Sequence, residues 1–453
     1  MKRCPRRALF VPLFLFGFLP VLSCATSIKH YPQINQCLLK EDYASARKLI
    51  RKNKKAYPKR NAVLYHLDEG VVSHFAGRYD DSNESFSKAE SRMEELYTKS
   101  LSKQAASFVI SDNTIPYRGE DFERAMVNLF MALNYAGLGD WEDALVEARK
   151  VDNTLTIINN QYGEGKKNIY KEDGFIRFLM GVLYEADGEL NDAFISYRKA
   201  EEIYRTDYLP NYGVAPPGFL IEKLLAAAQA MDFEQETEEI RQRYPEVTCR
   251  DTRDSTELAE VFFIHYNGLG PEKVEESFAV PMPDGFVVKI AYPTFVKRRY
   301  RISQAEVTLR NAVSGDAISF PTVLMEDISS IARLNLENRI NRIKAKAILR
   351  ATTKYLASKQ AEKSAEKHGG AWAGLLVKMT TNVAAAATEQ ADVRHWRLLP
   401  AEIRVGRALI PSGSYSGNLD FIDPRGAVHA RCEVHTFSVK AGEKKFFMFR
   451  TLE

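Results

Sequence analysis

The chain has 453 residues, of which 45% are hydrophobic and 27% are charged, and its formal net charge is +4. Residues 1–23 hold four positive charges and no negative ones, so residues 24–453 carry a formal net charge of 0. A neutral chain lacks the basic excess that nucleic-acid binding exploits, and we therefore expect no nucleic-acid partner. The length and the apolar content predict two or three packed domains.

The first residues have the composition of a signal peptide. Four basic residues precede an apolar run from Ala8 to Leu22, which is shorter than the roughly 20 residues of a membrane-spanning helix. The run ends in Val21-Leu22-Ser23-Cys24, which resembles a bacterial lipobox, although Leu22 is bulkier than the usual residue. The resemblance implies cleavage after residue 23, acylation of Cys24, as by palmitate, and a short tether over residues 24–30. The alternative is an ordinary signal peptide with an incidental cysteine.

The resemblance to lipoproteins extends to sorting. Ala25, where an inner-membrane protein would carry Asp, favours the outer membrane of a two-membrane cell, with the chain facing the periplasm. Such a compartment permits one disulfide among Cys37, Cys249 and Cys432, and the sequence leaves open which two, if any, are joined.

Residues 31–245 read as helical repeats. The clearest copy matches the tetratricopeptide (TPR) pattern at Gly181, Tyr184, Gly188, Leu190, Ala193, Tyr197 and Ala200. Two further copies have the same frame at Gly70, Gly77, Tyr79, Phe86 and Ala89, and at Tyr135, Gly139, Trp141, Ala144 and Ala148. We predict an all-α TPR solenoid of four to five helix pairs, with insertions at 102–120 and 154–174 that either line a binding face or are disordered.

The second half changes to alternating apolar and polar residues. A polar linker is predicted over residues 246–257, and a β-rich domain over 258–453. The alternating segments are 259–266, 286–292, 304–309, 402–409, 432–439 and 445–450. A helical hairpin is expected to interrupt them at about 328–390. The predicted fold class is therefore α+β and multidomain, with a TPR solenoid followed by an antiparallel β-sandwich-like domain that carries a helical-hairpin insertion.

Several segments resemble an uncharacterised family of bacterial TPR lipoproteins. They are Tyr117-x-Gly119-Glu120-x-Phe122-Glu123, Ala132-Leu133-Asn134-Tyr135, Val146-Glu147-Ala148-Arg149, Asn267-Gly268-Leu269-Gly270-Pro271-x-Lys273 and Ala391-Asp392-x-Arg394-x-Trp396-x-x-Leu399-Pro400. The resemblance covers nearly all of the chain after the signal peptide, and it implies the architecture and the lipid anchor. It implies no activity. The glycine-rich and asparagine-rich features of that family are only partly present, around Gly369-Gly370.

The polar residues around one repeat are the candidate partner-binding site. They are Glu120, Glu123, Asn134, Tyr135, Glu147 and Arg149. Helical spacing can bring several of them onto the concave face of a solenoid, whereas the alternative is that Glu147 and Arg149 cap and pair within their own helix hairpin. A hydrolase acid pair made of Glu120 and Glu123 is disfavoured, because such carboxylates normally come from different elements.

Residues 333–367 form a basic amphipathic helix with ten Lys or Arg against three Glu. Its candidate contacts to an anionic lipid or a cell-wall polymer are Arg339, Arg342, Lys346, Arg350 and Lys354. The alternative is that its apolar stripe packs on the sheet and that solvent surrounds its charges.

Metal and cofactor chemistry is not expected. The spacing of His429, Cys432 and His435 is that of a metal site, but in a strand both histidines face one side and Cys432 the other. We therefore predict no metal, no cofactor and no enzyme. The expected function is a scaffold that binds an envelope protein or peptide segment in an assembly or export system. The alternative is a peptidoglycan enzyme or its activator, with the β domain as the working part.

Overall fold

The computed structural model describes residues 30–102, 112–160, 169–247 and 258–452. Cys24 with the signal peptide, Cys249 with most of the predicted linker, and the central parts of both predicted insertions lie outside these ranges. Within the described residues, no helix is both long and apolar enough to cross a membrane.

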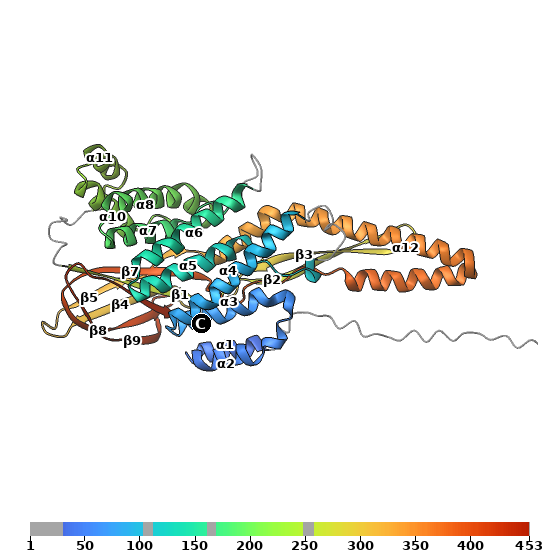
Figure 1. Ribbon diagram of the computed structural model, residues 1–453, viewed down its shortest axis with the longest axis horizontal. Helices are drawn as coiled ribbons and strands as arrows, with labels where there is room; N and C mark the ends of the chain where they lie inside the picture. Colours follow the sequence, from blue (N-terminus) through green and yellow to red (C-terminus); the bar gives the residue numbers. More distant parts are fainter. Residues whose placement is uncertain (1–29, 103–111, 161–168, 248–257, 453) are drawn as a thin grey trace, which may run out of the picture.

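The first half of the chain forms antiparallel helix pairs, as the repeat pattern predicts (Figure 1). The pairs are α1–α2 (Tyr31–Leu39, Tyr43–Lys52), α3–α4 (Ala62–Phe75, Tyr79–Ser102), α5–α6 (Asp121–Leu138, Trp141–Asn160), α7–α8 (Gly174–Ala186, Leu190–Ile203) and α10–α11 (Gly218–Ala230, Glu234–Arg243). A π-helical segment, Tyr204–Tyr208, and α9 (Leu209–Tyr212) join the last two pairs. The turns at Gly77, Gly139 and Gly188 have positive φ, which glycine adopts at the least cost.

Two four-stranded sheets follow. The first has the order β10-β1-β7-β6 (Lys444–Arg450, Leu258–Asn267, Glu402–Pro411, Val323–Glu326), and the second has the order β5-β4-β8-β9 (Ala317–Pro321, Gln304–Asn311, Gly413–Ile422, Val428–Val439). The prediction of a wholly antiparallel domain is wrong at one pair, because β1 and β10 run parallel. The reason is local: Gly442 donates a backbone hydrogen bond to the Leu258 carbonyl, so that β10 begins where β1 begins.

The first sheet lies between the helix pairs and the second sheet. On one face of β1, Phe262 and Tyr266 pack against helices: the Tyr266 ring stacks on Phe130 of α5 at 5.5 Å, and Phe262 meets Phe178 of α7 at 6.3 Å. On the other face, Phe263 packs in the core shared with the second sheet. The sheet thus covers α3, α5 and α7, the first helices of their pairs, which form the inner face of the repeats.

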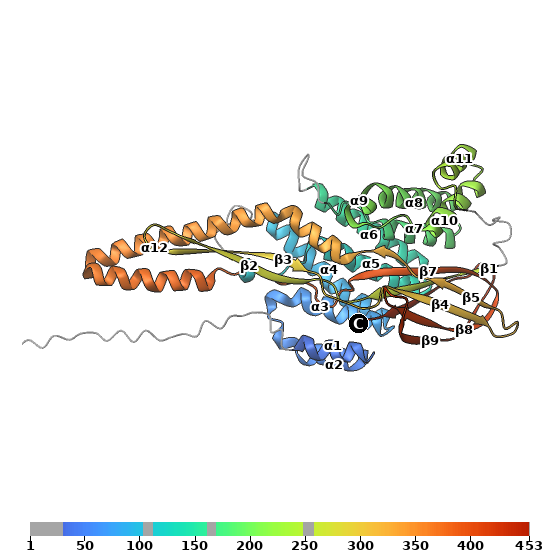
Figure 2. The same ribbon diagram turned by 180° about the vertical axis from the view of Figure 1, so that it is seen from behind.

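The remaining elements form a long projection, which we call the arm (Figures 1 and 2). It consists of the hairpin β2–β3 (Glu272–Pro281, Val287–Val296) and the part of α12 (Ile328–Thr388) beyond Arg339. The helix turns back at Gly370, where φ is 76°. Its first limb packs on the hairpin through a small core made of Phe286, Val288, Ile290, Ala347 and Ala351, and Ala385 of the returning limb packs against this core.

The packing of the repeats depends on glycine where two helices touch. A Cβ added to Gly181 of α7 would lie 2.3 Å from the ring of Tyr197 in α8. We expect Gly181→Ala to lower the free energy of unfolding by about 1–3 kcal/mol through overpacking, as measured by urea denaturation. Gly218→Ala is the matched control, because nothing lies within 4 Å of the added Cβ. Equal urea midpoints for the two variants would contradict this packing.

Candidate functional site

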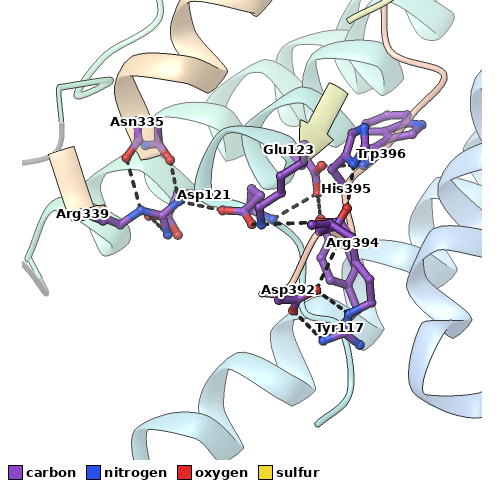
Figure 3. A network of polar contacts seen from close by, with 12 residues as sticks. Tyr117, Asp121, Glu123, Asn335, Arg339, Asp392, Arg394, His395 and Trp396 are labelled. Carbon is purple, nitrogen blue, oxygen red and sulfur yellow. Dashed lines mark hydrogen bonds and ion pairs between the residues drawn. The ribbon is translucent and has the colours of Figure 1, made fainter. Parts of the chain in front are cut away.

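The polar contacts between the repeats and the rest of the chain form a seam, and the candidate residue Glu123 lies in it (Figure 3). The candidate Glu120 lies in the seam too. Glu120, at the start of α5, accepts hydrogen bonds from Lys273 Nζ of β2 at 2.5 Å and from Arg339 of α12 at 2.6 Å. Arg339 also pairs with Asp121 at 3.3 Å. One carboxylate therefore joins a helix pair to both halves of the arm's base.

Glu123 lies one turn further along α5 and is wholly buried. Its carboxylate accepts hydrogen bonds from Tyr117 OH at 2.5 Å, from the Glu120 amide at 3.0 Å and from the Trp396 amide at 2.6 Å. The last contact fixes the segment between α12 and β7 against the repeats.

The pKa values of Glu120 and Glu123 are shifted from the ordinary carboxyl value in opposite directions. Burial raises the pKa of Glu120, but the charges of Lys273 and Arg339 outweigh burial and hold it below the ordinary value. Burial, and then the negative charge of Glu120, raise the pKa of Glu123 to about 7. Divergent pKa values are typical of catalytic acid pairs, but here the partners of both carboxyls are side chains and amides of the chain itself.

Arg394 adds a third contact to the seam. Its guanidinium pairs with Asp392 at 2.7 Å, and it donates to the Asn61 side chain at 3.1 Å and to the Ile115 carbonyl at 2.9 Å. Tyr117, Glu120, Glu123, Lys273, Arg394 and Trp396 all belong to the segments that carry the family resemblance. The structure brings these distant segments together at one place, where they hold the architecture.

Asn134 is also buried and occupied. Its side-chain oxygen lies 2.6 Å from His74 Nδ1, and His74 Nε2 lies 2.7 Å from the hydroxyl of Tyr266 in β1. Burial lowers the pKa of His74 to about 4, so the ring is neutral at pH 7 and bridges α5 to the sheet. The seam thus includes a neutral polar contact in addition to its charged ones.

The other three candidates of this set lie farther from the sheet. Glu147 is buried and accepts hydrogen bonds from Asn128 at 2.9 Å and from Lys150 at 2.8 Å. Arg149 is exposed and donates to the Tyr184 hydroxyl at 2.8 Å. Tyr135 is half-buried. Of the six candidates, Arg149 is therefore exposed and Tyr135 and Glu120 are partly exposed, whereas Glu123, Asn134 and Glu147 are buried.

Some of the candidate basic residues of α12 pair with carboxylates of the chain, and others are exposed or half-buried. Arg339 faces the seam, and Arg350 is buried against Glu389 at 3.1 Å. Lys354 pairs with the same carboxylate at 2.7 Å. Arg342 is exposed and Lys346 is half-buried. The guanidinium groups of Arg339 and Arg350 are thus turned toward the chain's own carboxylates, where an anionic surface does not reach them.

Two further buried carboxyls join the repeats to the sheet, one in a charged cluster and one through a tyrosine hydroxyl. Glu260 of β1 is buried and lies 2.8 Å from Lys223 of α10, 2.6 Å from Lys444 of β10 and 2.5 Å from Arg407 of β7. Glu326 of β6 is buried too, and its carboxyl accepts a hydrogen bond from the Tyr208 hydroxyl at 2.9 Å. Burial, and then the negative charge of Asp173, raise the pKa of Glu326 well above its ordinary value.

Across the described ranges, no three His, Cys, Asp or Glu side chains are arranged to hold a metal ion. His429 and His435 are exposed on β9, and Cys37 and Cys432 are free thiols. At Glu120 and at Glu260, the structure shows buried charges that are neutralised by partners within the chain.

Comparisons with known proteins find helical-repeat structures. BtubC from P. vanneervenii is 16% identical over 47% of this chain and 76% of its own, with a TM-score of 0.32. MamA is 15% identical over 47% and 92%, with a TM-score of 0.30, and a Podosopora anserina putative kinesin light chain with TPR-like repeats is 10% identical over 49% and 95%, with a TM-score of 0.32. No family model and no curated protein matches the chain. Likeness at this level says nothing of what the chain binds.

Loss of the Glu120 charge should loosen the seam. Glu120→Gln leaves the buried Lys273 without its counter-charge and leaves Arg339 paired with Asp121, and we expect the free energy of unfolding to fall by about 3–5 kcal/mol in urea denaturation. Glu337→Gln is the control, because its pair with Arg333 is exposed and contributes little. A Glu120→Gln midpoint equal to that of the control would show that the cluster does not hold the domains together.

Glu326 should make stability depend on pH. Because its pKa is raised in the folded state, folding keeps a proton that the unfolded chain releases, so stability is lost as pH rises above the ordinary carboxyl pKa. Glu326→Gln keeps an oxygen for the Tyr208 hydroxyl and removes this loss. We expect its melting temperature to exceed that of the native chain at about pH 8 and to match it at about pH 4. The exposed Glu433→Gln serves as the control, and equal differences at both pH values would refute the assignment.

Proposed function

We propose that this chain is a lipoprotein, anchored through Cys24 to the outer membrane of a two-membrane bacterium and facing the periplasm, that acts as a non-catalytic scaffold for an envelope protein or peptide segment. The signal-peptide composition and the lipobox resemblance support the anchor. Two or three acyl chains hold a folded domain at a bilayer stably.

The covered inner face of the repeats is the observation that carries the scaffold proposal. Repeat solenoids commonly bind partners on a concave face, but in this chain Phe262 and Tyr266 of its own sheet occupy that position. The repeats, the sheets and the base of the arm therefore form one body, and the outer helices of the repeats are among its free surfaces. Arg149 is exposed on one of these outer helices, α6, with the half-buried Tyr135 on the preceding α5, and we assign the partner to this surface.

The engaged carboxyls support a non-catalytic role. Hydrolysis of a wall polymer by an acid pair requires both carboxyls to reach the substrate. Glu120 is bound by Lys273 and Arg339, and Glu123 is wholly buried beneath Tyr117 and the Trp396 amide. Opening this pair would break the seam that holds the repeats to the arm.

Membrane attachment should depend on Cys24. In a Gram-negative host, we expect the native chain to fractionate with the outer membrane and its precursor to accumulate when globomycin blocks lipoprotein processing. Cys24→Ala should be found in the soluble periplasmic fraction. A native chain that is soluble and indifferent to the drug would overturn the anchor.

Partner binding is tested by a photo-crosslinking residue in place of Arg149 in the anchored chain. We expect a reproducible adduct with an envelope protein, identified by mass spectrometry. The same residue in place of Val313, which is 92% exposed in the turn between β4 and β5, is the control. Adducts that are the same from both positions, or absent from both, would remove the outer face as the binding surface.

A further inference from the structure

The returning limb of α12, residues 371–388, turns polar side chains toward the arm and large apolar side chains toward the exterior. Three of its polar side chains face inward: Lys378 donates to the Asp284 carbonyl, Thr381 bonds to Ser358, and Asn382 accepts from the Val287 amide. Helices on soluble proteins bury their apolar face and expose their polar one. This limb, which lies in the outer part of the arm (Figures 1 and 2), exposes its large apolar side chains instead.

The outward face of the limb is a continuous apolar stripe. Its members follow helical spacing, and their exposed fractions are 79% for Trp372, 45% for Leu375, 62% for Leu376, 60% for Met379 and 71% for Val383. Positions three, four, seven and eleven residues apart fall on one side of a helix. The stripe therefore runs along the limb for most of its length of about 27 Å.

Positive charges outnumber negative ones around the stripe. Residues 371–388 contain Lys378 and no Asp or Glu, and the neighbouring limb exposes Lys363 and Lys367 close to the turn at Gly370, with one exposed acid, Glu366, between them. Trp372 lies directly after this turn. A helix that presents Trp and Leu on one side, with lysines beside it, matches the composition of segments that lie in the interface of an anionic bilayer.

The size of the stripe disfavours a protein as its occupant. A stable protein interface uses roughly 20–30 residues on each side, whereas the stripe offers five side chains on one helix. A bilayer sets no such requirement, because each apolar side chain that enters the headgroup and acyl boundary contributes on its own.

We propose that the apolar stripe of residues 372–383 docks on a bilayer that contains anionic phospholipid, with the limb lying in the plane of the interface. The occupant of the stripe is lipid. The returning limb, rather than the basic limb that contains Arg339 and Arg350, is thus the membrane-contacting part of the arm. The inference rests on the proposed function in one respect: the proposed lipid anchor would place the chain beside a bilayer.

The test uses residues 24–453 with Cys24→Ala, so that no acyl group contributes and a failure of the predicted anchor leaves the result unaffected. The three tryptophans make fluorescence specific, because Trp396 is only 2% exposed and Trp141 packs on Phe446, whereas Trp372 is exposed. With vesicles of phosphatidylglycerol and phosphatidylethanolamine, we expect a blue shift of the emission and quenching by brominated lipid. Trp372→Phe should abolish both signals.

Matched variants distinguish binding through the stripe from nonspecific binding through other exposed apolar side chains. Leu376→Ser with Met379→Ser should weaken vesicle binding at least about tenfold, measured by co-sedimentation. Leu138→Ser with Val313→Ser is the control, since these apolar side chains are 50% and 92% exposed elsewhere. Lys363→Gln and Lys367→Gln should each cost about fivefold on the anionic vesicles and leave binding to phosphatidylcholine unchanged.

Three results would overturn the proposal. The first is an emission spectrum that vesicles leave unchanged, and the second is a stripe variant that binds vesicles as tightly as the control pair. The third is a native chain that is dimeric without lipid while the stripe variant is monomeric by light scattering, because a second copy would then be the occupant.

Discussion

Burial of strand β1 on both faces is the constraint on which the rest of the structure depends. Phe262 and Tyr266 fill the inner face of the helix pairs, and Phe263 fills the core between the two sheets. Each such side chain contributes roughly 1.5–3 kcal/mol when it leaves water. The repeats therefore cannot separate from the sheet without exposing the apolar surface of both, and the chain behaves as one body although its sequence divides into a helical and a β-rich half.

The charged contacts along the seam set position more than they add stability. Removing charges from water costs about as much as their attraction returns, so the Glu120 and Glu260 clusters are weak stabilisers compared with apolar side chains of equal volume. Their geometry is specific, however. Glu120 accepts from β2 and α12 together, and Glu260 from α10, β7 and β10. Such contacts select one register between repeats, sheet and arm, which the apolar contacts alone specify less sharply.

Local sequence patterns were enough to predict the helices and most of the strands. They were not enough to predict which distant segments pair with each other. Gly181, Ala193 and Tyr197 identify a repeat because their spacing reflects contacts inside one helix pair. Alternation likewise identified most strands, whereas β2 has a largely exposed run without alternation, and the parallel β1–β10 pair joins segments about 180 residues apart. For the candidate site, the sequence selected polar residues around one repeat but could not give the direction of their side chains. Glu120, Glu123 and Asn134 face inward because the sheet occupies the groove, and no local pattern records that.

The body and the arm differ in how they place their apolar side chains. In the body, the large apolar side chains of β1 pack in cores shared with the helices and with the second sheet, and buried carboxyls such as Glu123 and Glu326 have donors. The returning limb departs from this rule, since it gives its polar side chains to the arm and its Trp372, Leu376 and Met379 to the exterior. Exposed apolar side chains elsewhere on the body are scattered, whereas these follow one face of one helix. The stripe is consistent with an apolar environment outside the chain, and the arm's length carries it away from the body toward that environment.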